Sequence, residues 1–481
     1  MINVKNIVKT LEEDVYTLIK DSLEKNKAEK FLTLLELYKN TDFEDDDLIA
    51  ELGLKKGTFY TLKSRLYDKI QEMLTSTMNG EKVELIKQVQ HIPELLYNTD
   101  REISTAILLK LEEDLLEHDM PNELCEVFNA LKKINFNNNK YFEYSKKYNK
   151  YTAIKLAIDK ADDLFTKINL QISDYKNIKD VNILESLNLS LLELEKLNKV
   201  YESHHINFLC NLAKCSAYFV PDLKSSYENI LVDELLEQNK QLIKKYKGGD
   251  KFYYHYEVIN NYYFFVYYHH LKLHKKSKDY SSSVKDKLNS FFLMNHAANV
   301  SDFLIYQVER AIDLNKQHLL FNQLERIKDS IQIDTADVSN YIQYMKFVAL
   351  CHFYKFNYDS AISSLLELQK NVVFKNYPHA EIDFKLFLAV CYIYNRDEEN
   401  LVKILKSVIR NIKESPNIDK YNHALTFIKL LKIKLRKTNN PISKKVRSLI
   451  DNFTVNNKGS FKVLNYLIFD EDFTDIIKEK F

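Results

Sequence analysis

Apolar residues recur at helical spacing along most of this chain. Residues 7–38 carry Leu, Val, Ile and Tyr side chains at intervals of about three and four, which predicts one or two amphipathic helices. From residue 81 onward, amphipathic segments of ~12–25 residues alternate with short polar breaks. Such alternation is typical of helical hairpins stacked into an array, so the pattern predicts an all-α fold.

The polar breaks mark the predicted helix ends. They fall at residues 98–100, 119–122, 135–139, 203–205, 247–250, 334–336, 376–378, 395–397, 415–417 and 437–441. A further polar stretch, TSTMNG at residues 75–80, predicts a hinge between the N-terminal helices and the array that follows them.

Two segments in the C-terminal third share one spacing of small and apolar residues. Ala349 is followed twelve residues later by Ala361, and Ala389 is followed at the same offset by Leu401. Small residues at these positions allow two antiparallel helices to approach closely across a short polar turn. Residues 340–412 resemble tetratricopeptide repeats in this respect. The resemblance implies an α-solenoid of stacked antiparallel helix hairpins.

Residues 44–74 hold the most specific pattern of the chain. Leu48 and Leu52 are placed to face inward from one short helix, and Gly53 is where the chain reverses, because glycine adopts positive φ without steric cost. Leu54 follows in the turn. The apolar face of the second helix is Phe59, Leu62 and Leu66. The segment resembles bacterial helix-turn-helix modules, which implies that the second helix contacts duplex DNA.

When the outward positions of such modules are matched to this sequence residue by residue, the resemblance implies a set of side chains that contact DNA. They are Lys55, Lys56, Tyr60, Thr61, Ser64 and Arg65. Lys and Arg neutralise phosphates, while hydroxyl groups form hydrogen bonds to phosphates or base edges. We therefore expect these side chains to be exposed on one face of the second helix.

Charge leaves two interpretations of the N-terminal segment open. Residues 1–54 hold 7 Lys and Arg against 13 Asp and Glu, a net of −6, whereas residues 55–78 hold 5 against 2, a net of +3. An exposed basic helix favours DNA binding. Alternatively, the basic helix pairs with the acidic run between Asp42 and Asp47, and residues 1–78 form a capping bundle that does not bind DNA.

Composition supports the helical prediction. Six Gly and six Pro are far below the average use of about 7% and 5%, and this scarcity of turn residues argues against sheets. The net charge of +1 gives no overall field that would attract nucleic acid or membrane. No apolar run is long enough to span a bilayer, and the first residues lack the apolar core of a signal peptide. We predict a cytoplasmic protein with no membrane contact.

No residue pattern indicates catalysis or a cofactor. A Gly-rich phosphate loop, a nucleophile elbow and a metalloprotease helix are all missing from the sequence. We interpret His204 and His205 as polar turn residues, and the acid pairs Glu112–Glu113 and Asp162–Asp163 as solvated helix faces. The prediction is that the protein is not an enzyme and has no catalytic residues, no cofactor and no metal site.

Two further groups are interpreted as packing residues. The five Cys are scattered and are expected to be small buried apolar side chains. The aromatic segment 252–268 could stack bases, but it lacks interleaved basic residues and is expected to fill space between helices. His270 and His274 at the end of this segment could share a helical face, yet no further ligand lies at metal-binding spacing.

The sequence as a whole predicts three parts: a helix-turn-helix domain over 1–78, a tetratricopeptide-like α-solenoid over 81–455 and a helical tail over 456–481. The predicted function is that of a regulatory or adaptor protein. Its solenoid would bind a protein or peptide ligand, and its N-terminal module would bind duplex DNA. The alternative is a protein-interaction scaffold whose N-terminal domain is a structural cap.

Overall fold

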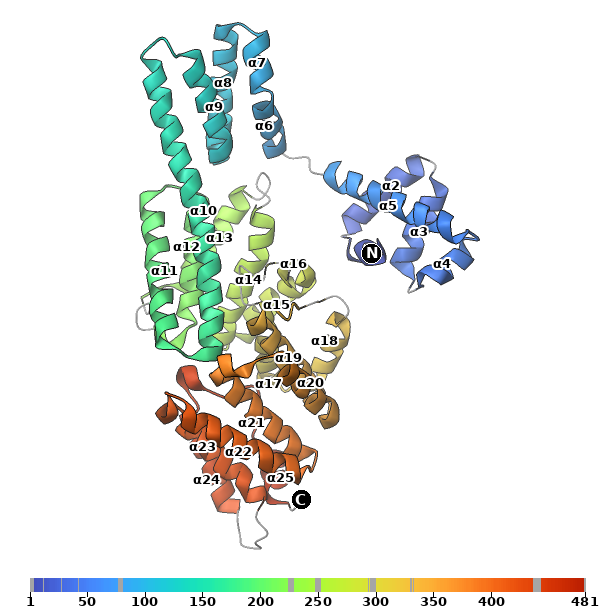
Figure 1. The fold of residues 1–481 in the computed structure, drawn as a ribbon, viewed down its shortest axis with the longest axis vertical. Coiled ribbons are helices and arrows are strands. Elements are labelled where there is room, and N and C mark those ends of the chain that lie inside the picture. The colour runs from blue at the N-terminus through green and yellow to red at the C-terminus, as the bar shows by residue number, and fades with distance from the viewer. Residues whose placement is uncertain are drawn as a thin grey trace. The chain divides into compact units, whose positions relative to one another are not determined.

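The computed structural model describes residues 4–11, 13–26, 28–41, 43–76, 81–223, 229–246, 252–292, 294, 300–328, 331, 333–435 and 443–479. Every secondary-structure element in these ranges is helical, and no strand occurs in them (Figure 1). The predicted all-α class is therefore confirmed. The physical reason is the one expected: apolar residues recur at helical spacing, and few Gly or Pro residues interrupt them.

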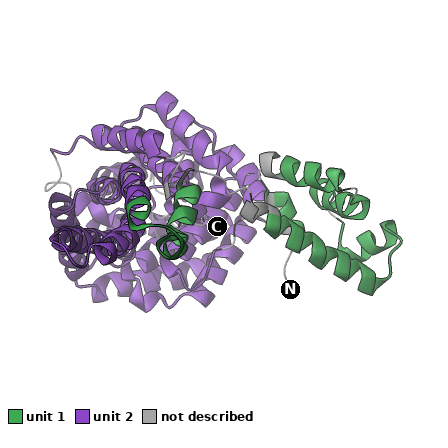
Figure 2. Cartoon of the chain, turned by 90° about the horizontal axis from the view of Figure 1, so that it is seen from above, with its two compact units in different colours: residues 1–104 green, residues 105–481 purple. Residues whose placement is uncertain are grey.

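The chain divides into an N-terminal unit, Met1–Ser104, and a C-terminal unit, Thr105–Phe481 (Figure 2). Each unit has an apolar core of its own. The core of the N-terminal unit runs from Val4 to Ile70, and the large core of the C-terminal unit runs from Ala157 to Ile477. The two cores share no residue, so each unit has its own set of stabilising contacts.

Seven helices lie within the described part of the N-terminal unit before α8 begins. They are α1 (Val4–Thr10), α2 (Glu13–Lys25), α3 (Glu29–Asn40), α4 (Asp45–Glu51), α5 (Lys56–Ser76), α6 (Glu81–Gln90) and α7 (Ile92–Asn98). Helix α3 packs against α1, α2 and α5 around the core, and α6 packs against α7. The sequence-based boundary at residue 78 lies inside this unit. Of the predicted hinge, residues 75 and 76 belong to α5 and residues 77–80 lie outside the described residues.

The first half of the C-terminal unit is built on one long helix. The helices here are α8 (Arg101–Glu117), α9 (Pro121–Ile134), α10 (Lys140–Ile178), α11 (Val181–Val200), α12 (His204–Tyr218), α13 (Val232–Tyr246) and α14 (Phe252–His270). Helix α10 has 39 residues and packs against α9, α11 and α12. It exceeds the predicted segment lengths because no Gly or Pro interrupts it and apolar residues continue at helical spacing to its end.

The second half consists mainly of consecutive helices that pack on each other as hairpins. The helices are α15 (His274–Asp286), α16 (Leu288–Phe292), α17 (Val300–Asp313), α18 (Leu320–Ile327), α19 (Val338–Phe353), α20 (Tyr358–Asn371), α21 (Pro378–Tyr394), α22 (Glu398–Glu414), α23 (Asn422–Lys434), α24 (Ser443–Asn456) and α25 (Glu471–Lys478). The short 3-10 helices are η2 (Gln317–Leu319), η3 (Phe374–Asn376), η4 (Ile418–Tyr421) and η5 (Gly459–Phe461). The pairs α14/α15, α19/α20, α21/α22 and α23/α24 are in contact.

Side-chain caps explain where three of these helices begin. The side chains of Asp337, Asn357 and Asp397 accept hydrogen bonds from backbone amides in the first turns of α19, α20 and α22. The break predicted at 395–397 therefore separates α21 from α22, and the capping residue Asp397 is its last member. The four residues of the predicted repeat spacing, Ala349, Ala361, Ala389 and Leu401, are all fully buried.

The C-terminal tail is only partly helical, which differs from the prediction of a helical tail over 456–481. After η5 the chain runs without regular structure to α25, and Val463 and Leu464 are buried in the core. The amide of Leu464 donates to Asp383 Oδ1 at 2.8 Å, so a side chain of α21 replaces the missing helical hydrogen bond. No helix within the described ranges is long and apolar enough to cross a membrane.

Candidate functional sites

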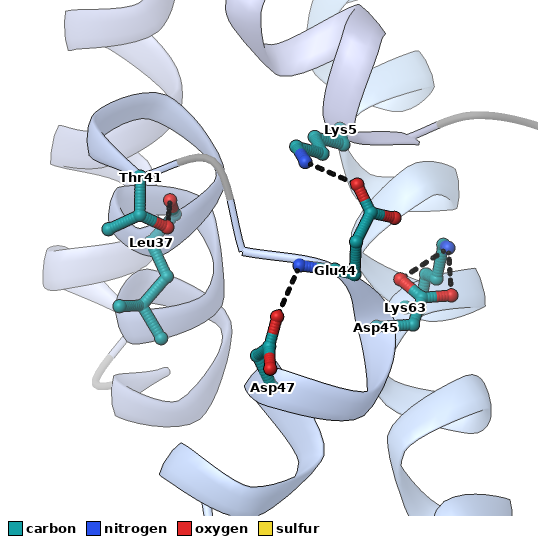
Figure 3. A network of polar contacts seen from close by, with 7 residues as sticks. All are labelled: Lys5, Leu37, Thr41, Glu44, Asp45, Asp47 and Lys63. Atoms are coloured by element: carbon teal, nitrogen blue, oxygen red, sulfur yellow. Dashed lines mark hydrogen bonds and ion pairs between the residues drawn. The ribbon is translucent and has the colours of Figure 1, made fainter.

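The turn between α4 and α5 has the geometry that the sequence predicts. Glu44 and Asp47 form a reciprocal capping box at the start of α4, with the Glu44 amide donating to Asp47 Oδ2 at 3.0 Å (Figure 3). Gly53 has φ +61°, the left-handed conformation that ends the helix, and the Leu54 amide donates to the Ile49 carbonyl at 3.1 Å. Helix α5 starts at Lys56, two residues after this turn closes.

The apolar face of this segment packs into the core of the N-terminal unit. Leu48, Phe59 and Leu66 are fully buried, whereas Leu52, Leu54 and Leu62 are half-buried against that core. The core therefore fixes how far α5 is rotated about its own axis. Its rotation determines which side chains of α5 face outward.

Five of the six residues expected to contact DNA are exposed. They are Lys55, Lys56, Thr61, Ser64 and Arg65. Tyr60 is the exception, because it is half-buried and its ring packs edge-on against Phe59 with centroids 5.7 Å apart. The exposed set combines ammonium, guanidinium and hydroxyl groups, which bind phosphate oxygens.

Ion pairs between α4 and α5 neutralise part of the basic charge. Lys63 Nζ lies 2.8 Å from Asp45 Oδ2, with only 15% of the lysine side chain exposed, and Lys56 Nζ lies 3.7 Å from Asp46 Oδ1 (Figure 3 for the first pair). In contrast, Lys55 and Arg65 form no ion pair within the described residues. These two side chains are the cationic groups of the expected set that are available to a ligand.

The C-terminal unit contains a charged cavity of about 200 Å³. The end of α10, the end of α14, helices α17, α19 and α21, and residues 459–466 line it. Two of its lysines are paired: Lys176 with Asp302, and Lys346 with Asp383, the latter at 2.7 Å. Charged side chains therefore line a partly open cavity beside the apolar core of this unit.

Lys179 is the unusual member of this cavity. It caps the C-terminus of α10 in the left-handed conformation, with φ 64°, and is only 7% exposed. Its Nζ lies 4.9 Å from the centre of the Tyr175 ring. Burial lowers the pKa of Lys179 to about 7, and the charge of Asp222 offsets part of this effect. A buried ammonium group in a cavity can hold a carboxylate or phosphate group of a ligand.

In each of two acid pairs expected to be solvated, one member is shielded from solvent: Glu112 is buried and Asp162 is half-buried. Glu112 is 7% exposed and pairs with Lys147 at 2.5 Å, and burial raises the pKa of Asp162 to about 6. Glu113 and Asp163 are exposed. The expectation was wrong for Glu112 and Asp162 because consecutive helical residues point about 100° apart, so adjacent acids do not share one face.

His204 and His205 are not turn residues. They form the first two positions of α12, and His205 is 9% exposed. A ring nitrogen of each and a carboxylate oxygen of Asp119 lie within 4.8 Å of one another. Sequence reasoning missed this group, because Asp119 belongs to a turn far away in the sequence and the two histidines stand directly after a polar break.

The packing interpretation of the aromatic segment and of most cysteines is confirmed. In α14, Tyr253, Tyr262 and Phe265 are among the buried rings. Cys210, Cys215, Cys351 and Cys391 are buried thiols, and Cys125 is half-buried. His270 ends α14 and His274 begins α15, so they do not share a face of one helix.

Comparisons with known proteins add no relative. No protein-family model matches the chain, and neither the curated proteins nor the solved structures give a match.

Proposed function

We propose that this protein is a regulatory adaptor that contacts duplex DNA through the start of α5 and binds a protein or peptide ligand through its C-terminal helical unit. The observation that supports the DNA contact is the exposure of Thr61, Ser64 and Arg65 on a helix whose opposite face is buried, with the exposed Lys55 directly before that helix. The helix follows a Gly turn with the φ that a helix-turn-helix requires.

The charged cavity of the C-terminal unit supports the proposed binding of a protein or peptide ligand. Its cavity offers the amine of Lys179, whose pKa is lowered to about 7 and which a bound carboxylate would hold in its charged form. The neighbouring ion pairs of Lys176 and Lys346 fix the surrounding walls. A peptide or protein carries carboxylate groups that such a cation would accept. A ligand bound there would contact residues of both α10 and α21.

Fluorescence anisotropy of a labelled duplex of mixed sequence, titrated with the full chain at several salt concentrations, tests the DNA contact. Each phosphate contact releases condensed counterions, so log K should fall with log salt by about 0.9 per contact. The two available cations, Lys55 and Arg65, predict a shallow slope of about 2. Binding that does not depend on salt, or no binding at low salt, would contradict the proposal.

A second function class is favoured by the ion pairs between α4 and α5. Lys56 and Lys63 already have carboxylate partners in Asp46 and Asp45, as expected for a structural cap. In that case the N-terminal unit stabilises or orients the chain and binds no DNA. The same titration separates the two classes, because a cap gives no salt-dependent anisotropy change.

A further inference from the structure

Three metal-ligand side chains meet between the α8–α9 turn and the start of α12. Asp119 lies in the turn, and His204 and His205 are the first residues of α12. One ligand atom from each lies within 4.8 Å of the others. The Nε2 atom of His204 is 3.3 Å from Asp119 Oδ2. Two ligands bound ~2.1 Å from one tetrahedral zinc ion lie ~3.4 Å apart, so this separation suits a shared metal.

Neighbouring side chains hold the two imidazoles and the carboxylate in place. His204 Nδ1 is hydrogen-bonded to the hydroxyl of Tyr253, which leaves Nε2 as the nitrogen directed at Asp119. The ring of Tyr246 stacks on His204 with centroids 3.8 Å apart and planes at 9°. Ser203 Oγ donates to Asp119 Oδ2 at 3.2 Å. A hydrogen bond to the second ring nitrogen is a regular feature of metal-bound histidine.

The second imidazole is also oriented. The rings of His205 and Tyr253 are nearly parallel, at 10° with centroids 5.8 Å apart. Because His205 follows His204 directly in the chain, it brings a second imidazole to the same place, with the two ring centres 4.3 Å apart.

We propose that Asp119, His204 and His205 bind one divalent transition-metal ion of the zinc class. Imidazole and carboxylate ligands suit this class, and three protein ligands leave a coordination position for water or a ligand. Asp119 and His204 line a cavity of about 620 Å³, whose walls also include Lys150, Tyr151 and Glu202 and which has room for such a ligand. All these residues belong to the C-terminal unit, so the site does not depend on the proposed DNA contact.

The left-handed backbone of Asp119 fits this role. Its φ is 46°, a conformation that non-glycine residues adopt infrequently. Asn and Asp tolerate it better than other side chains do, so Asp119→Asn preserves both size and backbone while removing the anionic ligand. This substitution separates metal binding from folding better than an alanine substitution at a buried histidine.

The test uses the full chain after dialysis against a chelator. Calorimetric titration with Zn²⁺ and visible absorption on titration with Co²⁺ should both saturate at one equivalent per chain. Asp119→Asn and His204→Ala each remove a metal ligand and should weaken Zn²⁺ binding by more than about 100-fold. Tyr253→Phe removes only the hydrogen bond to His204 Nδ1 and should weaken Zn²⁺ binding by about 10- to 100-fold. The control is His318→Ala, at an exposed histidine of the same unit, which should leave binding unchanged.

Two results would overturn the proposal. One is the absence of a one-equivalent site in the wild-type protein with both metals. The other is Zn²⁺ binding that Asp119→Asn leaves unchanged, because the metal would then lie elsewhere. Thermal melting supplies an independent readout: Zn²⁺ should raise the melting temperature of the wild type and of His318→Ala, but not that of Asp119→Asn.

Discussion

At the scale of single residues, the chemistry of the N-terminal unit depends on which lysines are paired. Lys63 is mostly buried against Asp45, so it contributes to folding rather than to recognition. Lys5 Nζ lies 3.1 Å from Glu44 Oε1 and neutralises a further acid next to α4 (Figure 3). Exposed pairs of this kind contribute at most about 1 kcal/mol. They do, however, offset the acidic run that would otherwise repel a phosphate backbone.

Lys179 gives a prediction about pH. Its pKa falls from 10.5 to about 7 on folding, so between these values the unfolded chain binds more protons than the native chain. The free energy of unfolding should therefore rise with pH at this site, by at most about 1.4 kcal/mol per pH unit. Lys179→Met should stabilise the protein at pH near 7, and this gain should shrink as the pH approaches 10.

Urea denaturation of the wild type and of Lys179→Met across this pH range measures the effect. Lys155→Met provides the control, because Lys155 is an exposed lysine of the same helix, α10, and does not line the cavity. Its difference from the wild type should not change with pH. Parallel stability curves for the wild type and Lys179→Met would show that Lys179 is not desolvated.

At the scale of elements, the sequence specified most helices and few of their polar contacts. The break at 395–397 could be predicted because Asn, Arg and Asp interrupt the apolar spacing and Asp397 is a good capping residue. The length of α10 was not predicted, because a polar surface stretch does not end a helix without Gly, Pro or a capping residue. The Asp119–His204 contact depends on how α8 packs near α12, which no local pattern encodes.

The two glycines near the turn between α4 and α5 should respond in opposite ways to alanine. Gly53 has φ +61°, so Gly53→Ala should destabilise the N-terminal unit by about 1 to 2 kcal/mol, although its Cβ would meet open space. Gly57 lies within α5 and also has open space around it. Gly57→Ala should be neutral or stabilise by up to about 1 kcal/mol. Thermal or urea unfolding measures the stability of both variants. Equal changes in stability for Gly53→Ala and Gly57→Ala would contradict the left-handed conformation of Gly53.

The hairpin of α19 and α20 gives a packing prediction. Ala349 is fully buried, so Ala349→Phe should overpack the contact between these helices and cost about 1–3 kcal/mol. Leu366→Phe places a similar ring on the exposed side of α20 and should change stability by less than about 0.5 kcal/mol. Calorimetric melting distinguishes the two. An unchanged melting temperature for Ala349→Phe would show that the predicted register of the hairpin is wrong.

At the scale of the whole molecule, two separate apolar cores allow two separable activities. The start of α5 is presented by the core of the N-terminal unit, and the charged cavity and the histidine cluster belong to the C-terminal unit. A substitution on the exposed face of α5 should therefore change DNA binding without changing metal binding or the stability of the C-terminal unit. Asp119→Asn should change metal binding without changing DNA binding or the stability of the N-terminal unit.

The most direct test of the DNA contact compares two charge-matched variants of the full chain. Lys55→Ala with Arg65→Ala removes two exposed cations, one directly before α5 and one near its middle. Lys25→Ala with Lys30→Ala removes two exposed cations from α2 and α3. Anisotropy with a labelled duplex should show a salt slope reduced by about 2 for the first variant and unchanged for the second. Equal loss in both variants, or none in the first, would contradict the assignment of the contact to α5.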